Sequence, residues 1–169
     1  MRYYDEIYSE TIPFKLIKYI LFLEGSIGVV FLVLYIMQLT GNLGIEDELP
    51  QWYFLIMAAI MLAVAVFLTN FRKLKIGITS DSLRASFGFI KFEVPLSSVS
   101  KVYTDEKSSL KYGGWGIRGR KYKEGWVLAY TTIGYKRVVL ELEGHKYKRF
   151  VFSTAHPEEM VNVVNQHLR

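Results

Sequence analysis

Two long apolar runs before residue 72 limit the folds open to this chain more than any other feature of its sequence. The runs are Leu16–Leu39 and Trp52–Phe71. At a rise of about 1.5 Å per residue they would form helices roughly 36 Å and 30 Å long, which is enough to cross the hydrocarbon core of a bilayer. The pattern therefore predicts a transmembrane α-hairpin in residues 1–71, with spans at about 16–39 and 52–71, and a second domain over residues 72–169.

The first run differs from a cleaved signal peptide in two ways. Acidic residues precede it, at Asp5, Glu6 and Glu10, and it is longer than the apolar core of a signal peptide. The other alternative is a hairpin buried in a soluble protein. Neither run has the charged face that an amphipathic helix turns to water, so we expect membrane spans.

Charged residues beside the runs predict the orientation. Lys15 lies directly before the first run and Lys18 in its first turn, and Arg72, Lys73 and Lys75 follow the second. The connector over residues 40–51 contains no Lys or Arg, and its acidic residues are Glu46, Asp47 and Glu48. The positive-inside rule then predicts a multi-pass protein of the cell membrane with both termini in the cytoplasm.

Glu24 is the one acidic residue within a span. Intramembrane carboxylates are costly and are often functional. Glu24 lies about a third of the way into its run, where it could reach the interface or pair with Arg72 or Lys73. A proton relay usually needs a chain of such groups, so the sequence favours a structural interpretation of Glu24.

Beyond residue 72 the apolar residues recur with a period of two, which is typical of strands. The alternation predicts seven strands, over residues 73–78, 83–87, 90–94, 99–104, 125–131, 137–143 and 146–153. A single helix follows, with Pro157 at its first position and Glu158 and Glu159 in its first turn, where the helix dipole favours negative charge. The predicted fold class is α+β: a membrane α-hairpin, then a seven-stranded antiparallel barrel or sandwich with a C-terminal capping helix.

Two segments also resemble a known family. They are Gly113-Gly114-Trp115-Gly116-Ile117-Arg118 and the run from Phe152 to Met160, which contains Pro157-Glu158-Glu159. Both resemble segments of prokaryotic membrane proteins that have two transmembrane helices followed by a domain similar to pleckstrin-homology (PH) folds. The resemblance covers nearly the whole chain. It implies a PH-like, strongly bent β-structure plugged by the C-terminal helix, and it implies little about activity.

The segment Lys107–Lys123 is the most distinctive part of the second domain because it is basic, aromatic and rich in glycine, with no acidic residue. Cationic groups and interfacial aromatic rings are what a headgroup site needs. We therefore expect an anionic headgroup or an acidic partner to bind here; the alternative is a solvated glycine-rich hairpin. The predicted ligand-binding residues are Lys111, Trp115, Arg118, Arg120, Lys121 and Lys123.

Signatures of catalysis and of metal or nucleic-acid binding are lacking. The chain has no cysteine, and the spacing of His145, His156 and His167 does not predict a metal site. The run Gly114–Gly119 matches G-x-G-x-x-G, but a strand rather than a helix is predicted after it, so we expect no dinucleotide site. The sequence predicts no enzyme, no cofactor, no bound metal and no nucleic-acid partner.

The two predicted domains differ in net charge. Residues 1–71 contain three basic and seven acidic residues, a net −4, whereas residues 72–169 contain 18 and nine, a net +9. We interpret the chain as a membrane-anchored binding module whose cytoplasmic domain binds an anionic lipid headgroup or an acidic protein partner. The alternative is a structural or assembly subunit of a membrane protein complex without a lipid-specific site.

Overall fold

The computed structural model describes residues 6–42, 49–50, 52–106 and 109–168, so the acidic connector residues Glu46, Asp47 and Glu48 lie outside the described residues. The chain divides into two compact units. Unit 1 contains the segment up to Phe14 together with the chain from Lys73 onward, and unit 2 is Lys15–Arg72. The segment Lys15–Arg72 is therefore an insertion within unit 1.

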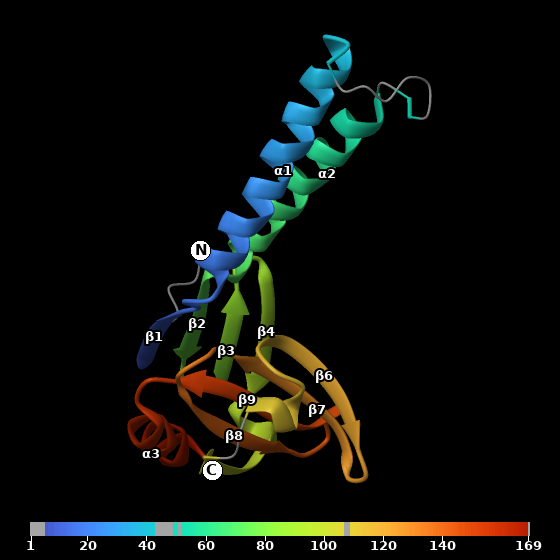
Figure 1. Cartoon of the computed structure of the whole chain (residues 1–169). Helices are drawn as coiled ribbons and strands as arrows, with labels where there is room; N and C mark the ends of the chain where they lie inside the picture. Colours follow the sequence, from blue (N-terminus) through green and yellow to red (C-terminus); the bar gives the residue numbers. More distant parts are fainter. Residues whose placement is uncertain (1–5, 43–48, 51, 107–108, 169) are drawn as a thin grey trace. The chain divides into compact units, whose positions relative to one another are not determined.

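Unit 2 is a helical hairpin, with α1 at Ile17–Leu39, α2 at Trp52–Leu68 and a 3-10 helix, η1, at Thr69–Arg72 (Figure 1). The segments 17–39 and 52–72 are long and apolar enough to cross a membrane, which confirms the prediction of two such helices. Small residues let the helices approach closely, since a Cβ placed on Gly28 would lie 3.4 Å from Cβ of Met61.

Glu24 lies on the face of α1 that packs against α2. It is half-buried, as are Gly28 and Phe31 four and seven residues further on, and the Phe31 ring lies 6.4 Å from that of Phe54. Within the part of the chain that the structure describes, no hydrogen bond or ion pair joins Glu24 to Arg72, Lys73 or any other residue.

Unit 1 contains nine strands among the described residues, not the seven predicted. They are β1 (Tyr8–Pro13), β2 (Lys73–Ile78), β3 (Ser82–Phe87), β4 (Ile90–Pro95), β5 (Val99–Asp105), β6 (Gly116–Tyr122), β7 (Gly125–Thr131), β8 (Lys136–Leu142) and β9 (Tyr147–Thr154). Two 3-10 helices, η2 (Leu96–Ser98) and η3 (Ser109–Tyr112), lie between them, and α3 (Pro157–His167) ends the unit. The α+β class and the helix start at Pro157 are confirmed.

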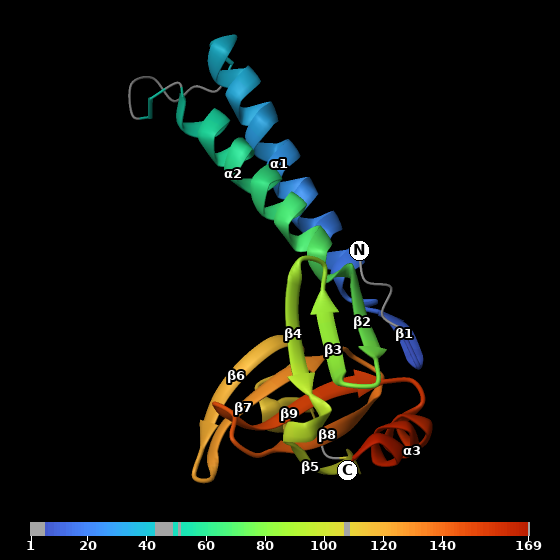
Figure 2. The same ribbon diagram turned by 180° about the vertical axis from the view of Figure 1, so that it is seen from behind.

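The strands form two sheets, of order β1-β2-β3-β4 and β5-β8-β9-β7-β6 (Figures 1 and 2). The predicted seven-stranded antiparallel barrel or sandwich is therefore wrong in its number of strands and as a single barrel, and it is not wholly antiparallel, because β7 and β9 pair in parallel. The two additional strands are β1 and β6. The sequence analysis assigned residues 8–13 to the anchor and residues 107–123 to a loop or hairpin outside the predicted strands.

The core of unit 1 lies between the two sheets. Phe92 from the first sheet contacts the rings of Tyr130 and Phe150 from the second, at centroid distances of 6.4 and 4.8 Å. Phe87 contacts Tyr130 at 5.9 Å. Helix α3 buries Met160 completely and packs on β5 and β8. The predicted C-terminal helix is therefore present and covers part of the second sheet.

Strand β1 is an integral part of this core although it precedes the membrane hairpin. It pairs with β2 over six residues, from Tyr8↔Ile78 to Pro13↔Lys73, and Ile12 is 1% exposed. The carboxylate of Glu10 accepts hydrogen bonds from Thr154 Oγ1 at 2.6 Å and from the Ala155 amide at 2.7 Å. Burial and the nearby Glu10 charge raise the pKa of Tyr8 to about 12.

Candidate functional site

Strands β6 and β7 form a hairpin that we call the basic hairpin, residues 116–131. Its two-residue turn is Lys123–Glu124, because Tyr122 pairs with Gly125. Strand β6 is hydrogen-bonded on one side only and is an edge of its sheet. Side chains on a strand alternate between faces, so Arg118, Arg120 and Tyr122 share one face of β6 and Lys121 lies on the other.

The face of the sheet that carries Arg118 and Arg120 holds a second, smaller apolar cluster. Its members are Tyr112, Val127, Ala129, Val139 and Val151, with Tyr103 and Tyr122 packed against them. The segment before the hairpin, residues 109–115, folds over this cluster. Tyr112, which is 6% exposed, is the aromatic side chain that this segment buries.

Hydrogen bonds hold this segment on the sheet at several points. The Tyr112 hydroxyl donates to Asp105, and the Tyr122 hydroxyl donates to the Lys111 carbonyl. Thr131 Oγ1 donates to the Gly114 carbonyl at 2.8 Å, and this path of the chain needs glycine, since Gly114 has a φ of 99°. The segment is thus an ordered part of the sheet surface rather than a free loop.

Tyr112 remains a hydrogen-bond donor at neutral pH. Burial raises the pKa of its hydroxyl above the usual range, and the hydrogen bond to the Asp105 carboxylate raises that pKa further. Burial also raises the pKa of Tyr103, on the neighbouring strand β5. Both hydroxyl groups therefore act as donors that position the cluster.

The structure separates the six predicted ligand-binding residues into groups. Lys111 lies on the folded-over segment with Nζ 5.5 Å from the centre of the Tyr112 ring, and Arg120 Cζ lies 5.5 Å from that of Tyr122. Arg118 Nε donates to the Gly113 carbonyl at 3.2 Å. Lys111, Arg118 and Arg120 therefore lie on one face of the sheet. The sequence alone did not predict that these three residues lie together.

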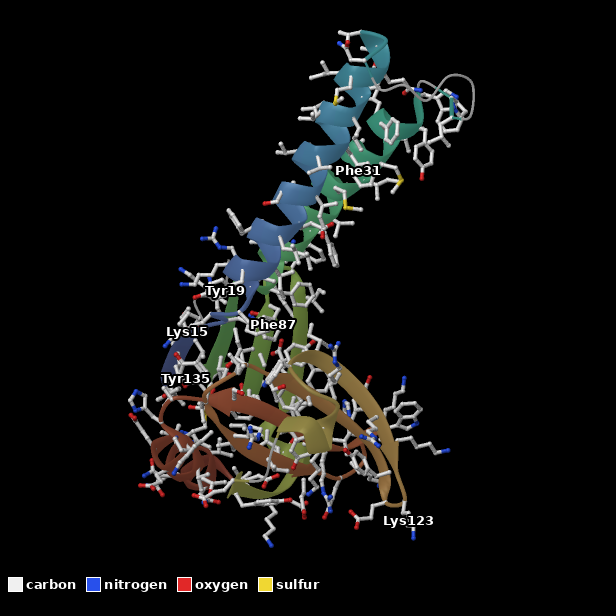
Figure 3. All side chains as sticks on the ribbon, in the orientation of Figure 1. Lys15, Tyr19, Phe31, Phe87, Lys123 and Tyr135 are labelled. Atoms are coloured by element: carbon white, nitrogen blue, oxygen red, sulfur yellow. The ribbon has the colours of Figure 1, made fainter. Side chains whose placement is uncertain are left out.

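The other three residues lie apart from that group. Lys121 is exposed on the opposite face, and Lys123 is exposed in the turn at the tip of the hairpin (Figure 3). Trp115 is half-buried just before β6. The structure therefore presents two cationic faces and a cationic tip instead of one continuous pocket.

Trp126 is a site residue that the sequence analysis missed. It is 43% exposed and is the direct partner of Lys121 on one side and of Tyr147 on the other. Lys146 Nζ lies 5.6 Å from the Tyr147 ring, so aromatic and cationic side chains also adjoin on this face. The signal in the sequence was an aromatic residue directly after Gly125, next to the turn. The exposure of the Trp126 side chain depends on the register of β7 with β6.

Glu124 is the acidic residue of the basic hairpin. It forms an ion pair with Arg149 of β9, and Arg149 Nε also lies 3.6 Å from the Glu141 carboxylate. Arg149 is thus shared by two carboxylates and offsets the charge of Glu124 only in part. The hairpin itself contains four basic residues and one acidic residue, so its net charge is positive.

The predicted motifs for metal and dinucleotide binding can be compared with the structure. No group of three His, Asp or Glu side chains that could hold a metal ion occurs there. Gly116–Gly119 lie in strand β6, so no helix opens after the G-x-G-x-x-G match. A cavity of about 360 Å³ beside the start of α3 is lined by Lys136, Ala155, His156, Pro157, Glu158 and Glu159.

Comparisons of the chain with protein-family models, with curated proteins and with solved structures found no match.

Proposed function

We propose that the chain is a membrane-anchored binding module. In this proposal α1 and α2 cross the bilayer, and unit 1 binds an anionic ligand through the basic hairpin. The observation that carries the binding role is the clustering of Lys111, Arg118 and Arg120 on one face, with Lys121 on the other. Similarity to membrane-anchored PH-like proteins is part of the proposal and is supported by two packed sheets followed by a C-terminal helix.

Exposure of the helices supports membrane insertion. Their outward side chains are large and apolar; Phe22 is 79% exposed and Leu62 is 68% exposed. Soluble proteins rarely expose apolar surface of this extent, because hydration of such a surface is unfavourable. Insertion into a bilayer removes that cost, and both helices have the length that a helix needs to cross the hydrocarbon core.

The pairing of β1 with β2 supports a hairpin with both ends on one side of the membrane. Strand β1 ends three residues before α1, and β2 begins directly after η1. Two strands of one sheet must lie in one compartment, so the helices between them must cross an even number of times. Together with Lys15, Lys18 and Arg72, this arrangement supports a cytoplasmic location for unit 1 in the cell membrane.

The β1 pairing also argues against a cleaved signal sequence. Cleavage after α1 would remove β1 from the sheet, and with it the buried Ile12 and the Glu10 hydrogen bonds to Thr154 and Ala155. An anchor that stays attached keeps the sheet complete.

Neutralising the hairpin is expected to abolish most of the anion binding. The test variant carries Arg118→Gln, Arg120→Gln, Lys121→Gln and Lys123→Gln. We expect its affinity for fluorescent poly-glutamate or for anionic vesicles to fall roughly tenfold or more, since each basic group near an anionic surface contributes about 1 kcal/mol. Binding is measured with the full chain at low and moderate salt. The chain is held in non-ionic detergent when the peptide is the ligand, and in neutral nanodiscs when co-flotation with vesicles is followed.

A matched control removes the same charge elsewhere. Lys75→Gln, Lys91→Gln, Lys101→Gln and Lys136→Gln change exposed residues outside the hairpin. Equal losses in the two variants would show only net-charge attraction, and no binding by the unmodified chain would favour an assembly subunit instead. Vesicle binding without peptide binding would identify lipid headgroups as the ligand.

A further inference from the structure

The two sheets of unit 1 have four edge strands, and their charges differ. The edges are β1, β4, β5 and β6. Strand β1 carries the acidic Glu10, β4 carries Lys91 and Glu93, and β5 carries Lys101 and Asp105. The charged residues of β6 are Arg118, Arg120 and Lys121, so β6 is the edge with basic residues alone.

Other edges are engaged by neighbouring parts of unit 1. Helix α3 packs on β5, and the Glu10 carboxylate ties β1 to Thr154 and Ala155. Strand β4 is limited in another way: its Glu93 is paired with Arg84 of the adjacent β3 at 2.8 Å, and Pro95, which lacks an amide hydrogen, ends the strand.

Strand β6 lies on the outer side of the second sheet (Figure 1). Its register with β7 turns the backbone groups of Ile117, Gly119 and Lys121 outward. The Ile117 carbonyl accepts a hydrogen bond from Arg118 Nη1 at 3.2 Å, so the outward groups of Gly119 and Lys121 are the ones that a further strand would pair with first.

The two faces of β6 differ in what they offer to a neighbouring strand. One face presents Arg118 and Arg120, two residues apart, which matches the spacing of alternate side chains on an added strand. The other presents Lys121 beside the exposed indole of Trp126. Carboxylates suit the first face, whereas apolar side chains suit the Trp126 face and the methylene stem of Lys121.

The hairpin tip lies at the end of unit 1 opposite to the connections with unit 2. Those connections leave unit 1 after Pro13 and before Lys73, which are paired at one end of the first sheet. Lys123 lies at the other end of unit 1 (Figures 1 and 3). A ligand at the hairpin tip therefore approaches a part of unit 1 remote from its attachment points.

We propose that β6 accepts an extended acidic polypeptide segment as a sixth strand of the second sheet, with acidic side chains at alternate positions facing Arg118 and Arg120 and β-branched apolar side chains facing Trp126. Backbone hydrogen bonds to the β6 edge supply affinity, and the alternation of charge supplies register. The inference rests on the proposed function, since it names the partner class of the same basic hairpin.

Alternately N-methylated peptides test strand addition directly. The probe is a fluorescent seven-residue peptide with glutamate at alternate positions and valine between them, and its binding to the full chain in non-ionic detergent is followed by anisotropy. Two derivatives are N-methylated, one at each glutamate and the other at each valine. In an added strand the amides of either the glutamates or the valines point to β6 and donate hydrogen bonds to it. Methylation of that set should weaken binding about tenfold or more, while methylation of the other set should leave the affinity within about threefold of the parent peptide.

The outcomes separate this inference from the proposed function. Equal binding by the parent and both derivatives overturns strand addition and leaves electrostatic binding intact. Failure of both the probe and poly-glutamate to bind overturns the proposed function together with the inference. Arg118→Gln with Arg120→Gln should weaken the probe about tenfold or more, and equal weakening by Lys75→Gln with Lys91→Gln also overturns the proposal.

Discussion

A chain in which residues 15–72 are replaced by a short turn is expected to fold as a soluble domain, whereas the fragment 73–169 is expected to lose its stable fold. Pro13 and Lys73 are directly paired, so Asn-Gly placed between Phe14 and Lys73 gives a three-residue loop that can close β1 and β2 into a hairpin, with the glycine in the left-handed conformation. The fragment lacks β1 and leaves β2 as an exposed edge.

The size of the effect follows from the buried side chains of β1 and of Phe14, the residue directly after it. Ile12 is 1% exposed and Phe14 is 7% exposed. Loss of each buried side chain of this size costs about 2–5 kcal/mol, which is a large part of the roughly 5–15 kcal/mol that stabilises a whole domain. Loss of the Glu10 hydrogen bonds adds to that cost.

Size-exclusion chromatography and urea unfolding of the two proteins measure the difference. The turn-closed chain should be monomeric or discretely oligomeric, with a cooperative transition, and the fragment should aggregate or unfold without one. A fragment as stable as the turn-closed chain within about 1 kcal/mol would contradict the role assigned to β1.

Phe150→Ala is expected to destabilise the same turn-closed chain by about 3–5 kcal/mol. Phe150 is completely buried on β9, and its ring centre lies 4.8 Å from that of Phe92 and 5.6 Å from those of Tyr130 and Phe152. Truncation removes the central ring that joins the two sheets. The cavity that remains cannot be filled without moving both sheets.

Trp126→Ala is the matched control for Phe150→Ala because it removes a larger ring from the adjacent strand. Trp126 is 43% exposed, so we expect the free energy of unfolding to fall by about 1 kcal/mol or less. Urea unfolding of both variants gives the comparison. Similar losses for the two would show that the sheets do not pack through Phe150.

Seven of the nine strands follow from the pattern of apolar residues. Strand β2 alternates between buried and exposed residues, whereas β7, β8 and β9 are short apolar runs that are buried on both faces. Strand β1 could not be found in this way, since its partner β2 lies some 60 residues later and the intervening apolar runs dominate the sequence pattern. Pairing across such a separation depends on tertiary structure rather than on local periodicity.

Strand β6 lacks the alternation for a different physical reason. It is an edge strand with two glycines and three basic residues, and most of its side chains face water. The basic character of the site was therefore visible in the sequence, but the division of Arg118, Arg120 and Lys121 between two faces required the register with β7. The same register places Trp126 beside Lys121, and the fold of residues 109–115 selects Tyr112 rather than Trp115 for burial.

Cysteine accessibility tests the membrane-anchored arrangement most directly, because the chain has no cysteine of its own. Single variants Ser9→Cys in β1, Asn42→Cys after α1 and Gln166→Cys in α3 change exposed residues. Each is expressed in bacterial cells and treated with a membrane-impermeant maleimide before and after permeabilisation. The account predicts labelling of Asn42→Cys in intact cells, and of Ser9→Cys and Gln166→Cys only after permeabilisation. Labelling of Asn42→Cys under the same conditions as Ser9→Cys would contradict it, because the helices would then not cross the bilayer.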